Sequence, residues 1–253
     1  MSARMKIWLL PALLYGAFLF WYTPTGGPLS DVEVDNFIAK MEQNGGASEA
    51  MAMIRQFGEE DTGKHFIMIN NIDYNESPGD VAGAAPGENA QQLMDRYMGH
   101  MIPAMLSRGS HPVMLGPAAY LSMDVIGVEG VEVWDMGGLV RYRSRRDFLE
   151  IVTDPAFSGK HHFKAAALEK TIAFPVEPDF NLGDPRLLLG LLILSLSALA
   201  DARHSSQRGS DRKPHSPLRG VPTTPWRLNA ANLRIKPRPR GYLHARCVGS
   251  RMP

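Results

Sequence analysis

Apolar positions between residues 64 and 175 follow two different periods along the chain, and the change from one period to the other predicts a mixed fold. Short apolar runs rich in β-branched and aromatic residues are typical of strands, while apolar residues three and four apart indicate helices. Taken in order, the region predicts strand, helix, strand, strand, helix pair and strand. The strands are expected at residues 65–72, 111–116, 131–142 and 171–174, and the helices at residues 88–106, 144–152 and 154–168.

Local signals support the second half of this pattern. Gly137 and Gly138 lie in the middle of the third predicted strand, where a β-bulge would fit. Ser144 can cap the following helix, and Asp154 with Pro155 can start the next one, because proline at the first helical position lacks only an N–H that would be unpaired anyway. The order of elements therefore predicts strand, helix pair, strand over residues 131–175.

This order corresponds to two split βαβ halves. The predicted fold class is α+β, a ferredoxin-like fold with a four-stranded antiparallel sheet and its helices on one face. The other sheet face needs a cover, and a second copy of the same sheet would provide it. We therefore expect a homodimer, in the arrangement known as a dimeric α+β barrel.

Two uncharged apolar runs flank this region. The first, residues 7–22, follows Arg4 and Lys6 and approaches the roughly 20 residues that a spanning helix needs. We favour a retained membrane anchor; a cleaved signal peptide, which has the same basic start, is the alternative. The second run, residues 187–200, is short for a span, so a buried or interfacial helix competes with the membrane helix that we favour.

These signals divide the chain into five segments. The capping box formed by Ser30 and Glu33 starts two short helices between the first anchor and the main domain. The segments are an N-terminal membrane anchor at residues 1–29, two short helices at residues 30–59, the ferredoxin-like domain at residues 60–180, a second membrane helix at residues 186–200 and a basic disordered tail at residues 201–253.

The near-neutral total charge conceals a strong asymmetry. Residues 23–185 carry 12 Lys and Arg against 24 Asp and Glu, whereas residues 201–253 carry 12 against 2. Positive charges tend to stay on the cytoplasmic side of a membrane, so we expect both chain ends in the cytoplasm and the acidic domain across a bacterial inner membrane. The tail could bind anionic lipid or nucleic acid, but its lack of apolar periodicity favours disorder, and we expect no nucleic-acid partner.

Several stretches of the chain resemble an uncharacterised bacterial family, a domain of unknown function in the dimeric α+β barrel superfamily. The stretches that carry the resemblance are residues 139–147, 154–157 and 161–167, with residues 64–70 and 108–113 resembling other strand entries of that family. The resemblance covers roughly residues 60–176 and implies a fold and a dimer. The family has no agreed reaction, so it implies no catalytic residues; the wider superfamily includes haem-degrading and quinol-forming monooxygenases and lactone isomerases, which is an analogy of fold alone.

Five residues are the candidates for a ligand pocket. His161 and His162 could bind haem iron or move a proton, although adjacent helical residues point about 100° apart, so one of the rings is expected to face away. Arg141 and Arg143 share a strand face and could bind a carboxylate or phosphate, with salt bridges around a dimer rim as the alternative. Asn70 is a polar residue inside an apolar strand, so it is expected to line a small pocket or to mark a bulge or edge.

Two functions of different class follow. The favoured one is a membrane-anchored dimer that binds a small ligand or a partner without catalysis, because no activated pair of side chains is visible. The alternative is a cofactor-light or haem-dependent monooxygenase or isomerase with a pocket between sheet and helices. Metal-type Cys/His spacings, phosphate loops and dinucleotide motifs are absent from the sequence, so we expect no metal and no cofactor, with haem as the one exception to be considered.

Overall fold

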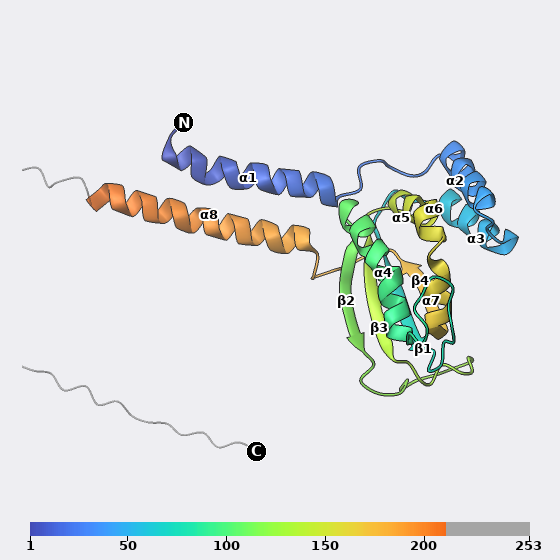
Figure 1. Ribbon diagram of the computed structural model, residues 1–253. Helices are drawn as coiled ribbons and strands as arrows, with labels where there is room; N and C mark the ends of the chain where they lie inside the picture. Colours follow the sequence, from blue (N-terminus) through green and yellow to red (C-terminus); the bar gives the residue numbers. More distant parts are fainter. Residues whose placement is uncertain (211–253) are drawn as a thin grey trace, which may run out of the picture. The chain divides into compact units, whose positions relative to one another are not determined.

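The computed structural model describes residues 1–210 of the 253-residue chain, so most of the predicted basic tail lies outside the described residues. Four strands and eight helices make up the described part (Figure 1). The strands are β1 Phe66–Tyr74, β2 His111–Pro117, β3 Met136–Tyr142 and β4 Leu168–Val176. The helices are α1 Ala3–Tyr22, α2 Asp31–Gln43, α3 Ser48–Glu59, α4 Ala90–Ser107, α5 Arg145–Val152, α6 Pro155–Ser158, α7 His161–Ala167 and α8 Pro185–Ser210.

The strands form one antiparallel sheet in the order β2-β3-β1-β4. In this order the two central strands, β1 and β3, come from different halves of the chain, which is the ferredoxin-like topology. The predicted fold class is therefore confirmed. β1 pairs with β3 in an unbroken register from Phe66 opposite Tyr142 to Ile72 opposite Met136, so no bulge forms at Gly137 and Gly138.

Helices α4, α5 and α7 cover one face of this sheet. Side chains alternate along a strand, and Phe66 on β1 and Tyr142 on β3 pack against Met101 and Met105 of α4 and Ile151 of α5. A second cluster joins α4 to α7 through Leu93, Met94 and Phe163. The residues that alternate with these strand positions form the opposite face, which we call the open face.

Helices α4, α5 and α6 each begin after a residue whose side chain accepts a hydrogen bond from a free N–H of the first turn. Asn89 and Gln92 form a capping box at the start of α4. The helix begins at Ala90, two residues later than predicted. Ser144 caps α5 by accepting a hydrogen bond from the Asp147 N–H, as predicted. Asp154 caps α6 with Pro155 in the first turn, also as predicted.

Other predicted boundaries also differ from the structure. Residues 131–135 are not strand: the Val131 carbonyl accepts hydrogen bonds from the Ser122 hydroxyl and the Trp134 indole, which holds this segment in the long loop before β3. The predicted helix at residues 154–168 is broken at Gly159 into α6 and α7, and β4 already begins at Leu168. The second apolar helix continues ten residues past Ala200, because residues 201–208 contain neither glycine nor proline to end it.

Two helices are long and apolar enough to cross a membrane by length and composition alone, Ala3–Tyr22 and Pro185–Arg208. They contact each other along their lengths. Arg4 forms an ion pair with Asp201, and the Tyr15 hydroxyl donates to the Arg186 carbonyl at 2.7 Å.

Candidate functional site

A cavity of about 290 Å³ lies between the helix-covered face of the sheet and α4. Its walls are mainly apolar, and five methionines contribute to them. The methionines are Met94, Met98, Met101, Met105 and Met136; the other lining residues that matter below are Asn70, Asp95, Tyr97, Leu115, Gly138, Val140, Tyr142 and Lys164. Methionine is flexible and polarisable, and its sulfur contacts aromatic rings favourably, so such walls suit an apolar or flat ligand.

Gly138 leaves room for this cavity. It faces the helices in the middle of β3, opposite Asn70, and a Cβ atom built on it would lie 2.9 Å from a terminal carbon of the Leu115 side chain. Its neighbour Gly137 lies on the open face, where a built Cβ would meet nothing within 4 Å. The glycine pair that suggested a bulge in the sequence therefore leaves space on both faces of β3.

Several polar groups line the cavity, including the exposed side chains of Gln91 and Asp95 and the Tyr74 hydroxyl, which contacts the Met136 sulfur. Four others lie against the apolar walls. The Asn70 amide nitrogen donates to the Met68 carbonyl at 3.0 Å. The hydroxyls of Tyr97 and Tyr142 and the amine of Lys164 have no hydrogen-bond or ion-pair partner among residues 1–210. Burial raises the pKa of both tyrosines and lowers the pKa of Lys164. These groups are hydrogen-bond donors in an apolar space, so they favour a ligand that carries acceptor oxygens.

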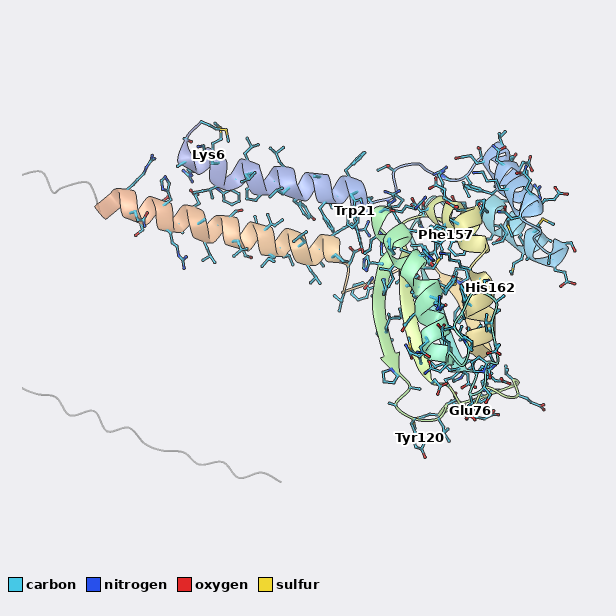
Figure 2. The ribbon with its side chains drawn as sticks, viewed as in Figure 1. Lys6, Trp21, Glu76, Tyr120, Phe157 and His162 are labelled. Carbon is cyan, nitrogen blue, oxygen red and sulfur yellow. The ribbon has the colours of Figure 1, made fainter. Side chains whose placement is uncertain are left out.

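Asn70 is the one predicted site residue that lines the cavity. His161 is exposed beside α4, where its ring meets the Tyr97 ring edge-on with 6.3 Å between centroids, and partial loss of hydration lowers its pKa. His162 is exposed on α7 (Figure 2) and its Nε2 lies 3.0 Å from the Ala82 carbonyl. Neither imidazole lines the cavity, so neither is placed to bind the iron of a haem inside it. Within residues 1–210, no group of three or more His, Cys, Asp or Glu residues is arranged to hold a metal ion.

The two predicted arginines lie at the end of α1 instead. Arg141 is only 1% exposed; its guanidinium stacks 3.7 Å from the centre of the Tyr22 ring and donates to the carbonyls of Gly109 and Tyr22. Arg143 donates to the Trp21 carbonyl at 3.0 Å and pairs with Asp147. We call Tyr22, His111, Arg141 and Arg143 the neck cluster, because they join the last residues of α1 to the sheet.

The geometry of the neck cluster is close and specific. The Tyr22 hydroxyl lies 2.9 Å from His111 Nε2, and the two rings also stack. Gly109 has φ +66°, and a Cβ built on it would lie 2.6 Å from the Trp21 carbonyl oxygen, so only glycine fits this turn. The last two carbonyls of α1, which have no partner inside the helix, thus receive guanidinium donors.

Two further arginines, Arg145 and Arg146, follow Arg141 and Arg143 in the sequence and join the domain to the short helices α2 and α3. Arg145 donates to the Phe57 carbonyl of α3 and pairs with Glu177, while Arg146 pairs with Glu33 of α2. The sequence offers four nearby acids as partners for these arginines, namely Glu132, Asp135, Asp147 and Glu150; of these, only Asp147 pairs with them among the described residues. The other partners are backbone carbonyls and acids distant in sequence.

Tyr97, Tyr142 and Lys164 line the cavity but were not among the predicted site residues. Tyr142 lies between Arg141 and Arg143 on the strand and therefore on the opposite face, but nothing in the sequence marks that face as hollow. Lys164 lies within residues 161–167, where His161 and His162 are the more obvious candidates for a site. A single lysine between apolar residues on a helix is a weak signal on its own, since such residues are common on solvated surfaces.

The fold and the cavity define the class of this protein as an α+β protein of ferredoxin-like topology with a small apolar cavity beneath α4. No family model matches the chain, and no curated protein matches it either. The resemblance to the uncharacterised bacterial family therefore stays a prediction.

Solved structures of unknown function are similar to part of the chain. A crystal structure of a protein from Rhodopseudomonas palustris is 19% identical, covers 53% of this chain and 95% of that chain, and has a TM-score of 0.43. A protein from Bacteroides fragilis, described as dimeric with a ferredoxin-like fold, is 16% identical, covers 45% of this chain and 96% of that chain, and has a TM-score of 0.27. At these values the fold assignment rests on the strand order and register described above.

Proposed function

We propose that this chain is a membrane-anchored module that binds a small, largely apolar molecule in the cavity between its sheet and α4. The observation that carries the proposal is the cavity itself, an apolar space of about 290 Å³ in which two tyrosine hydroxyls and a lysine amine lack partners among the described residues. None of these three atoms is fully sealed from solvent, so a ligand that enters the cavity can reach each of them and supply the missing partner.

Anchoring is supported by the two apolar helices. In α1 and α8 most side chains are exposed, which is costly in water over helices of 20 and 26 residues but favourable in a bilayer. The Arg4–Asp201 ion pair joins the start of α1 to the later part of α8, where a charged pair would lie at the level of the lipid head groups. We also propose the orientation that the charge distribution predicts, with the acidic domain outside the cytoplasm.

Self-association is supported by the open face of the sheet. Its apolar positions include Ile172, Phe174 and Val176, which are 37–45% exposed, together with Met114 at 54%. A second copy of the sheet would remove this surface from water, at roughly 25 cal/mol per Å² of apolar area. A monomeric mass of the full chain in detergent micelles would contradict a dimer.

The binding function is tested by filling the cavity. In the Gly138→Val variant two methyl groups and a Cβ enter the cavity beside Leu115, whose flexible side-chain end can give way. We expect the variant to fold with wild-type thermal stability or better, because filling a cavity adds contacts, and to lose at least tenfold in affinity for apolar probes. The measurement is equilibrium dialysis of the full chain in micelles with methyl 2-naphthoate.

The matched control is Gly137→Val, one residue away on the open face of the same strand. It makes the same chemical change and the same change in strand propensity but leaves the cavity intact. Equal affinity of the two variants, or a wild-type chain that takes up no more probe than empty micelles do, would show that the cavity is not a binding site.

A further inference from the structure

The position of Lys164 on α7 narrows the kind of molecule that the cavity can take. Its side chain lines the cavity, with the amine 5.8 Å from the centre of the Tyr97 ring, and it makes neither a hydrogen bond nor an ion pair with residues 1–210. An ammonium group held against an aromatic ring and apolar walls loses hydration, so a bound anion would stabilise it.

The acidic residues nearby do not supply that anion. Glu88 is paired with Arg96, and Asp73 is paired with Lys170. Asp95 is exposed at the cavity lining and lies beyond 4 Å from the Lys164 amine, since no ion pair forms between them in the described part of the chain. Among residues 1–210, Lys164 therefore lines the cavity without an ion-pair partner.

Three other polar groups of the cavity can donate hydrogen bonds to an anion, while the one carboxylate of the lining, Asp95, is exposed. Tyr97 and Tyr142 each offer a hydroxyl that can donate, and the Asn70 amide lies on β1 across the cavity from α4. A carboxylate has two acceptor oxygens and about four lone-pair sites, which suits several donors at once. The methionine walls suit an aromatic ring, because thioether sulfur packs well against ring edges.

We propose that the cavity binds a small aromatic carboxylic acid, with the carboxylate paired to the Lys164 ammonium and the ring packed against the methionines of α4. This inference rests on the proposed function of the cavity and adds the chemical class of its ligand. Lys164 sets the preference for charge, while the apolar walls supply the affinity that a neutral analogue retains.

The test compares 2-naphthoate with its methyl ester, two molecules that differ in charge and one methyl group. The full chain in detergent micelles is dialysed against each probe, with empty micelles measuring partition into detergent. We expect the acid to bind at least tenfold more tightly than the ester, because a charge-assisted hydrogen bond forms in an apolar site. This comparison uses the wild-type chain, so it does not depend on any variant folding.

Two variants then assign the preference to Lys164. In Lys164→Met the acid should fall to the affinity of the ester, while the ester stays within about twofold of its wild-type value; in Lys164→Arg the preference for the acid should remain. Lys160→Met is the control, since it removes a lysine one helical turn away that does not line the cavity.

The possible results distinguish the proposal that the ligand is a carboxylic acid from the broader proposal that the cavity binds an apolar molecule. Equal binding of acid and ester by the wild-type chain, or an acid preference that survives in Lys164→Met, would overturn the carboxylate proposal and leave the cavity as a binding site. Binding of neither probe above the empty-micelle level would overturn both.

Discussion

His65, the residue before β1, is a buried group that the fold keeps neutral. Its Nε2 atom has no hydrogen-bond partner among residues 1–210. Burial, together with the positive charge of Arg141, lowers the pKa of His65 from the usual 6.5 to about 4. The protonated ring is therefore far less favourable in the folded chain than in the unfolded chain.

This difference in pKa predicts a loss of stability in acid. Because the folded pKa lies below the unfolded one, the stabilisation from neutral His65 is complete above pH 6.5 and is lost as the pH falls from 6.5 to about 4. The loss is at most about 1.4 kcal/mol per pH unit in that window. We expect His65→Gln to flatten the fall in thermal unfolding temperature between pH 7 and pH 4.5.

The control for this prediction is His162→Gln, which changes an exposed histidine on α7. Unfolding temperatures of His65→Gln that fall as steeply as those of the wild-type chain would assign the acid sensitivity to other groups.

Among the elements, α1 is joined to β3 through the side chains of the neck cluster. Arg141 spans this contact: it is on β3, and its guanidinium reaches the last carbonyl of α1 and the turn after α4. Burial lowers the pKa of Arg141 to about 10, so the group still carries its charge at neutral pH. The contact between α1 and β3 thus consists of the buried Arg141 guanidinium, the Tyr22 ring and backbone carbonyl groups.

Removing Arg141 should loosen this joint. In Arg141→Met the carbonyls of Gly109 and Tyr22 lose their donors, which costs about 1–3 kcal/mol for each buried group left unsatisfied. We expect a lower unfolding temperature for the full chain and faster proteolysis in residues 23–29. Arg55→Met, which removes an exposed arginine paired with Asp35, should change neither measurement.

The helices and strands could be predicted from the sequence better than the side-chain contacts that join them. Strand and helix signals are local, so the four strands and their order followed from periods of two and three to four residues. The targets of Arg141 and Arg143 could not be predicted, because the carbonyls that they bind lie up to 122 residues away and carry no side-chain signature. The cavity was equally hidden, since it depends on a side chain that Gly138 lacks.

For the whole molecule, charge and hydropathy together predict its orientation in a membrane. The domain between the apolar helices is acidic, whereas both ends of the chain are basic. The chain contains one cysteine, Cys247, near its C-terminus, and it lies outside the described residues. Met123 is 92% exposed in the loop between β2 and β3 and gives a second position for a label.

The orientation predicts opposite labelling of these two positions by a maleimide that cannot cross membranes. In bacterial spheroplasts, we expect the wild-type chain to stay unlabelled at Cys247 until the membrane is opened. A chain that combines Cys247→Ser with Met123→Cys should be labelled at once. Labelling of Cys247 and protection of position 123 would reverse the orientation, and loss of the chain on washing the membranes would refute the anchor.

The neck cluster would also transmit movements of α1 to the sheet. Tyr22 is both the last residue of α1 and a buried residue of the domain, so no flexible linker separates the helix from the sheet. A spanning helix changes its tilt when the thickness of the bilayer changes. With α1 in a membrane, that tilt would act as a lever on β3, the same strand that carries Gly138, Val140 and Tyr142 into the cavity. The thickness of the surrounding lipid would thus bear directly on the shape of the binding space.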